Sequence, residues 1–105
     1  MRRLPRLSRQ SVLLLDELLR DPSARRYGYD LMKSTDLSAG TLYPLLARLT
    51  DLGWLATSWE QQSPAGRPPR HLYRLTADGA RGVQEALDRA AARGWRITPP
   101  REQRA

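Results

Sequence analysis

The stretch Ser38-Ala-Gly-Thr-Leu-Tyr-Pro-Leu-Leu-Ala-Arg-Leu49 carries the strongest indication of the fold. Its leucines recur at the spacing of one helix face and predict an amphipathic helix over residues 38–52. They are Leu42, Leu45, Leu46 and Leu49. The opposite face gathers small, hydroxyl-bearing or cationic residues, namely Gly40, Thr41, Tyr43, Pro44, Ala47 and Arg48. Such a helix can enter the major groove of DNA, although the spacing alone also fits an ordinary amphipathic surface helix.

Two shorter helices are expected before this stretch. Residues 8–20 repeat leucines at helical spacing, with Ser8 or Ser11 as the N-terminal cap and Pro22 just beyond the end. A second helix is expected over about residues 24–34. Its candidates for packing are Tyr29, Leu31 and Met32. Together with residues 38–52, these segments predict a three-helix unit.

The helix of residues 38–52 contains a proline and is followed by a glycine. Pro44 faces the carbonyl of Gly40, where the backbone yields most easily, so we expect a slight bend and not a break. Gly53 is expected to cap the C-terminal end.

A β-hairpin is expected after the third helix. Residues 54–60 and 71–76 alternate in the manner of strands. The segment between them is rich in Pro and Gly and carries Arg67 and Arg70, which predicts a long basic tip. Trp54 and Trp59 are expected in the core, and His71 on a face of the hairpin and not in a metal site.

The C-terminal part is expected to form a last helix over residues 77–97, capped by Thr76. Its alanine-rich apolar stripe is longer than a small domain needs to cover itself, which favours dimerisation through Val83, Leu87, Ala90 and Ala91. Trp95 follows near the end of this helix. Residues 98–105 are expected to be a disordered tail.

Charge and composition narrow the classes of function. The chain has 105 residues, with 18 Lys+Arg against 11 Asp+Glu and a net charge of +7. Lys33 is the single lysine, so the positive charge is almost all arginine, which suits contacts with phosphate and base edges. There is no cysteine, no nucleophile–base constellation and no cluster of metal ligands, so we expect neither an enzyme nor a cofactor. The segments are too short to span a membrane, and a cytoplasmic location is expected.

These elements predict a winged helix-turn-helix, mainly α-helical with a two-stranded hairpin and a C-terminal dimerisation helix. Residues 1–76 are expected to form the DNA-binding domain, with a basic N-terminal arm containing Arg2, Arg3, Arg6 and Arg9. Residues 77–97 are expected to form the dimerisation helix of the same domain. In this architecture the third helix enters the major groove and the hairpin tip lies over the adjacent backbone.

Five blocks of the sequence resemble the PadR family of bacterial transcriptional regulators. They are Tyr27-Gly-Tyr-Asp-Leu31, Gly40-Thr-Leu-Tyr-Pro-Leu-Leu-Ala-Arg-Leu49, Gly53-Trp54, Gly66-Arg-Pro-Pro-Arg70 and Tyr73-Arg-Leu-Thr-Ala-Asp-Gly79, in the order of the family. The resemblance implies a homodimeric winged-helix protein that binds double-stranded DNA, usually as a repressor, and often responds to a small aromatic effector. The connection from Tyr29 to Thr41 is shorter than in many relatives, which bears on the pose of the recognition helix.

Candidate DNA-binding residues follow from these positions: Ser38, Gly40, Thr41, Tyr43, Pro44, Arg48, Lys33, Arg67 and Arg70. Ser38 or Thr41 either binds a phosphate or caps the helix, and Tyr43 either contacts DNA or braces the second helix. Arg48 is expected at the DNA backbone or in solvent. Trp95 either stacks a flat ligand or packs on the first helix of a partner chain. The alternative function is a winged-helix module that binds protein and has only weak, non-specific affinity for DNA.

Overall fold

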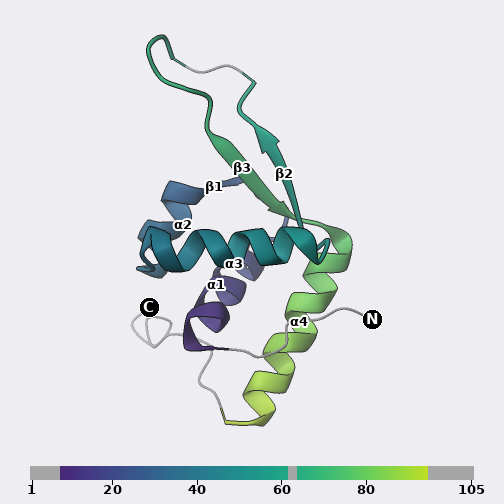
Figure 1. Ribbon diagram of the computed structural model, residues 1–105. Coiled ribbons are helices and arrows are strands. Elements are labelled where there is room, and N and C mark those ends of the chain that lie inside the picture. Colours follow the sequence, from purple (N-terminus) through teal and green to yellow (C-terminus); the bar gives the residue numbers. More distant parts are fainter. Residues whose placement is uncertain (1–7, 62–63, 95–105) are drawn as a thin grey trace, which may run out of the picture.

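The computed structural model describes residues 8–61 and 64–94, and within these residues the chain forms four helices and one small sheet (Figure 1). The elements are α1 (Arg9–Arg20), β1 (Arg26–Tyr27), α2 (Gly28–Thr35), α3 (Ala39–Asp51), β2 (Leu55–Trp59), β3 (His71–Leu75) and α4 (Ala77–Ala92). The strands are antiparallel in the order β1-β3-β2. The β2–β3 hairpin, called the wing below, rises away from the helices (Figure 1). This arrangement confirms the predicted mainly helical winged fold.

The sheet has one strand more than the sequence predicted. The helix expected over residues 24–34 begins only at Gly28, because the two preceding residues form β1 and pair with Leu72 and Tyr73 of β3. This pairing uses backbone groups that the edge of β3 would otherwise present to solvent. The short strand thereby ties the start of α2 to the base of the wing.

The first helix begins as predicted, at a serine cap. Ser8 accepts a hydrogen bond from the Ser11 backbone N–H at 3.1 Å, and Ser11 Oγ accepts one from the Ser8 backbone N–H at 2.8 Å. This reciprocal capping box satisfies two N–H groups at the helix start. The helix ends at Arg20, with Asp21 as the C-terminal cap and Pro22 directly after it.

The third helix runs through Pro44 without a break and ends in a glycine cap, as expected. Gly53 has a φ of +81°, and its N–H donates to the Thr50 carbonyl at 3.0 Å. The Trp54 N–H donates to the Leu49 carbonyl at 2.9 Å. The two bonds form a Schellman motif, which reverses the chain and directs it into β2.

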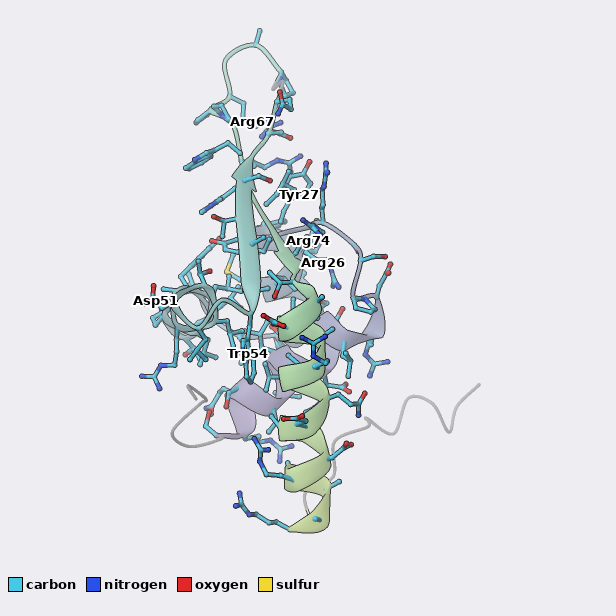
Figure 2. The ribbon with its side chains drawn as sticks, turned by 90° about the vertical axis from the view of Figure 1, so that its right-hand side faces the viewer. Arg26, Tyr27, Asp51, Trp54, Arg67 and Arg74 are labelled. Atoms are coloured by element: carbon cyan, nitrogen blue, oxygen red, sulfur yellow. The ribbon has the colours of Figure 1, made fainter. Side chains whose placement is uncertain are left out.

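The fourth helix starts beside the end of α3. Thr76 Oγ1 accepts from the Gly79 N–H at 2.8 Å, as predicted for the cap, and also donates to the Gly53 carbonyl at 2.8 Å. Gly79 and Gly82 lie against Trp54, and a side-chain carbon at either position would collide with it. Figure 2 shows Trp54 at this junction of helices. Because these two positions of α4 have no side chain, the indole of Trp54 can pack in the core.

The core joins leucines of the first three helices to residues of the sheet and α4. Its largest fully buried side chains are Leu14, Leu15, Leu31, Leu42, Leu46 and Val83. Leu31 is buried as predicted and Met32 is partly buried, whereas Tyr29 is 59% exposed and the prediction that it packs is wrong. Trp54 is buried as predicted.

The apolar stripe of α4 is covered by the chain itself. Val83, Leu87 and Ala90 are 0%, 5% and 1% exposed and belong to the same core as α1. This burial corrects the expectation that the three form a dimer surface, because a stripe already packed within one chain is not free for a partner. Ala91 lies on the exposed side. Within the described ranges, no helix is long and apolar enough to cross a membrane.

Candidate nucleic-acid interface

The exposed side of α3 carries the residues that the sequence assigned to DNA. The leucine face is turned inward, and Gly40, Tyr43, Pro44 and Arg48 are exposed while Thr41 is half-buried. This side therefore offers small and polar groups along one face of a helix that the core holds rigidly. Such a surface fits the width of a major groove.

The N-terminal end of α3 is formed by Ser38 and Thr41. Ser38 is the N-cap by backbone geometry, but its hydroxyl donates to Thr41 Oγ1 at 3.3 Å instead of accepting from a helix N–H. Its carbonyl accepts from the N–H groups of Thr41 and Leu42 at 3.1 and 2.8 Å. The two hydroxyls thus lie side by side at the helix start, where backbone N–H groups favour a phosphate.

Tyr43 braces the second helix and is still accessible. Its ring and hydroxyl lie over Gly28, so closely that a side-chain carbon at position 28 would collide with them. The residue is nevertheless 41% exposed. Burial raises the pKa of the neighbouring Tyr73 hydroxyl, and the proximity of Tyr43 raises it further. Tyr43 thus braces α2, which is one of its two predicted roles, and part of its side chain stays exposed.

A shallow hollow lies between the start of α1 and the exposed side of α3. It is lined by Ser8, Gln10, Ser11, Thr41, Pro44, Leu45 and Arg48. Hydroxyl and amide groups line one wall, and the guanidinium of Arg48 supplies a positive charge. Arg48 therefore lies at the edge of a partly polar hollow beside α3.

The two wing arginines form a cluster with a carboxylate. Arg67 and Arg70, predicted at the basic tip of the hairpin, both form ion pairs with Glu60, at 3.1 and 3.2 Å. The guanidinium carbon of Arg70 also lies 3.8 Å from the centre of the Tyr27 ring. Figure 2 shows Arg67 and Tyr27 along the wing. The attraction between the carboxylate just after β2 and the two guanidinium groups of the loop before β3 holds the arginines against the wing.

Glu60 was not singled out by the sequence, although it is the centre of this cluster. Its side chain is 11% exposed and accepts hydrogen bonds from the Arg70 backbone N–H at 3.1 Å and the Tyr27 hydroxyl at 3.1 Å. Burial alone would raise the pKa of this carboxyl, but these bonds and the two guanidinium groups hold the pKa below its usual value. For Arg70, burial lowers the pKa, and the hydrogen bond and charge of Glu60 more than offset it, so the pKa is raised.

An aromatic stack lies on the other face of the wing. Trp59 and His71 are paired across the strands, with ring centres 4.5 Å apart and planes 10° apart, and His71 lies 4.8 Å from Tyr73. Trp59 is 62% exposed, so the prediction that it belongs to the core is wrong. Trp59 alternates with the buried Leu55 onto the same face of β2, but the wing extends past the helices at this point (Figure 1). His71 lies on a hairpin face, as predicted.

Of the remaining candidate residues, the structure describes Lys33 but not Trp95. Lys33 is exposed on α2, with its ammonium 5.5 Å from the centre of the Tyr29 ring. Trp95, the arginines of the N-terminal arm before Ser8, and the tail of residues 98–105 lie outside the described residues.

The chain is similar to known transcriptional regulators. A family model described as the transcriptional regulator PadR-like family matches residues 17–85. A PadR-like transcription factor from Bacteroides fragilis superposes with a TM-score of 0.65 at 26% identity, covering 82% of this chain and 86% of that one. A PadR family regulator from Eggerthella lenta gives a TM-score of 0.59 at 34% identity, over 79% of this chain and 72% of the other.

A third similar structure is that of Bordetella bronchiseptica BpsR, whose DNA binding is regulated by 6-hydroxynicotinic acid. Its TM-score is 0.63 at 27% identity, covering 82% of this chain and 61% of that one. No match was found among curated proteins.

Proposed function

Since the chain belongs to the PadR-like family of transcriptional regulators, we propose that it acts as a homodimeric, sequence-specific repressor. DNA binding and transcription regulation, not enzymatic catalysis, are the activities of this family. In the proposed complex α3 lies in the major groove, and the wing contacts the backbone next to it.

The exposed side of α3 is the observation that carries the proposal. Thr41 and Tyr43 are the residues proposed to reach base edges, since Thr41 has its hydroxyl on that side and the Tyr43 side chain is 41% exposed there. Ser38 is proposed to bind a phosphate at the helix start, and Arg48 and Lys33 to contact the backbone from α3 and α2. Gly40 has no side chain and Pro44 only a compact ring, so that the backbone of α3 can approach the DNA.

Wing arginines are proposed to supply sequence-independent affinity. Arg67 and Arg70 lie on one side of the wing, and a guanidinium can bind a phosphate through two N–H groups. Each phosphate contact releases counterions, so affinity should fall steeply as salt rises.

Homodimerisation is proposed to use the C-terminal end of α4, on the side that carries Ala91. Ala91 is exposed there, and Trp95 follows three residues after the last residue of the helix. Two copies would place their recognition helices about one turn of DNA apart, which corresponds to roughly ten base pairs.

Control by a small aromatic effector is proposed by analogy with the BpsR structure. Trp95 would stack on the ring of such a ligand near the dimer axis. The winged-helix module that binds protein is the alternative, and the exposed Trp59 is the surface that it would use.

A footprinting experiment on the promoter region of its own gene tests the proposed function. We expect two protected half-sites about ten base pairs apart, related by a two-fold axis. Protection of a single half-site would contradict the dimer. The absence of protection, with retained binding to any duplex at low salt, would favour the protein-binding alternative.

A further inference from the structure

We propose that Glu60 is an internal competitor for DNA phosphate, which holds Arg67 and Arg70 and so limits how tightly the wing binds the DNA backbone. This inference rests on the proposed function, because it concerns the contribution of the wing to DNA binding. It assigns a role to a carboxylate in the middle of a basic surface, where its negative charge repels the phosphate of the ligand.

One carboxylate engages both arginines. The Nη2 atoms of Arg67 and Arg70 lie 3.1 and 3.2 Å from the two oxygens of Glu60. Carboxylate and phosphate are alternative partners of a guanidinium, and both accept its N–H groups in the same plane. A phosphate that binds these arginines therefore has to displace Glu60 or share them with it.

The exposure of the three side chains shows where exchange can occur. The side chain of Glu60 is 11% exposed, whereas those of Arg67 and Arg70 are 33% and 44% exposed. The carboxylate thus lies on the inner side of the cluster and the guanidinium groups on the outer side. DNA approaching the wing meets the arginines first, with the negative charge directly behind them.

Glu60 keeps partners when the guanidinium groups leave. The Tyr27 hydroxyl and the Arg70 backbone N–H both donate to it at 3.1 Å, and neither depends on the position of a guanidinium. A half-buried carboxylate with such donors remains satisfied. The exchange is therefore reversible, and the wing can take up and release phosphate without refolding.

The expected size of the effect follows from Coulomb attraction and repulsion. A unit negative charge about 6 Å from a phosphate weakens its binding by about threefold in a medium with the dielectric of water, and by more where water is excluded. The effect should be the same on every sequence, since phosphate contacts carry no base information.

The test compares Glu60→Gln with Glu85→Gln, in the full chain, on a promoter duplex and a scrambled duplex. Glutamine removes the charge and retains one acceptor oxygen, for either the Tyr27 hydroxyl or the Arg70 backbone N–H, which donate to different oxygens of Glu60. Glu85 is exposed on α4, so its variant reproduces the change in net charge away from the wing. Dissociation constants are measured by fluorescence anisotropy over a salt series.

We expect E60Q to bind both duplexes at least about threefold more tightly than E85Q at low salt, with a steeper dependence on salt. The difference should disappear when Arg67 and Arg70 are also replaced by Ala. Equal affinities of E60Q and E85Q, or weaker binding by E60Q, would overturn the proposal. A wild-type protein that does not distinguish the two duplexes would contradict the proposed function, while leaving the comparison of E60Q with E85Q intact.

A measurement on the wild-type protein avoids any loss of folding in the variant. The ¹³C resonance of the Glu60 side-chain carboxyl is recorded with and without DNA. Release of the guanidinium groups should shift this resonance, with that of Glu85 as the internal control. An unchanged Glu60 resonance in the DNA complex would show that the arginines stay on the carboxylate, and the proposal would fail.

Discussion

The phenol ring of Tyr43 in α3 lies over Gly28, the first residue of α2. The relationship joins the recognition helix to the preceding helix at a point where only glycine leaves room. It also fixes which edge of the tyrosine faces outward. The pose of a proposed base-contacting residue is thus set by a residue 15 positions earlier in the chain.

Replacing this glycine should disturb DNA recognition more than folding. In Gly28→Ala the added carbon displaces the Tyr43 ring, while alanine gains up to about 1 kcal/mol in helix propensity, which offsets the strain. We expect the free energy of unfolding to change by less than about 1 kcal/mol. The preference for promoter over scrambled DNA should fall clearly in anisotropy titrations. An unchanged preference would show that the pose of Tyr43 is irrelevant to recognition.

Replacing Gly79, in contrast, should disturb folding. A side-chain carbon at Gly79 would meet the backbone carbonyl of Trp54, which cannot move aside as a tyrosine ring can. Gly79→Ala should therefore lower the free energy of unfolding by about 2 to 3 kcal/mol, as overpacking does. Gly40→Ala is the matched control, because open space surrounds that position. Urea unfolding measures both, and equal stabilities would contradict the tight contact.

The two helix caps of similar chemistry should differ in strength. Thr76 Oγ1 makes hydrogen bonds to the Gly79 N–H and the Gly53 carbonyl, so Thr76→Ala should cost about 1 to 2 kcal/mol. The hydroxyl of Ser38 makes no such cap bond to α3, and Ser38→Ala should cost less than about 0.5 kcal/mol. Thermal unfolding of the two variants tests this order, which a larger loss for Ser38→Ala would refute.

Acid should weaken the wing through Glu60. The pKa of this carboxyl is below its unfolded value of about 4.5, so it stabilises the folded state above that pH. The contribution is lost as the pH falls through the lower, folded-state pKa. Between pH 5 and pH 3 the melting temperature of the wild type should therefore fall more than that of E60Q. Parallel curves for the two proteins would show that the cluster adds nothing to stability.

Wing and helix variants should separate affinity from specificity. Arg70→Ala is expected to weaken binding to promoter and scrambled duplexes by the same factor and to reduce the salt slope by about 1. Arg89→Ala on the exposed side of α4 is the control for net charge. Thr41→Ala should instead reduce the preference for the promoter. A sequence-dependent loss in R70A would mean that the wing reads bases.

The sequence predicted those parts of the fold that depend on local patterns. The leucines of α3 repeat with the helical period, Gly53 provides a positive φ, and Thr76 precedes an acidic first turn, so each element could be recognised from its neighbours. The fold class followed from their order. Strand β1 could not be recognised in this way, because its two residues are ordered by a partner strand more than 40 positions later.

The site was predicted less completely, for the same reason. Glu60 and Tyr27 are 33 positions apart, and only the three-stranded sheet brings them together with Arg70. The sequence offered one signal for this cluster, namely a carboxylate at the end of a predicted strand, directly before a basic loop. The apolar period of α4 identified its buried face, but a period does not tell whether that face is covered by the same chain or by a partner.

Sequence-specific DNA binding by a dimer is tested most directly by fluorescence anisotropy with the promoter duplex of the protein's own gene and a scrambled duplex, across a salt series. We expect saturable binding of two chains per site, with a preference for the promoter that persists at moderate salt while total affinity falls. Equal, weak binding to both duplexes that vanishes with salt would contradict it, and would leave a basic winged domain without sequence recognition.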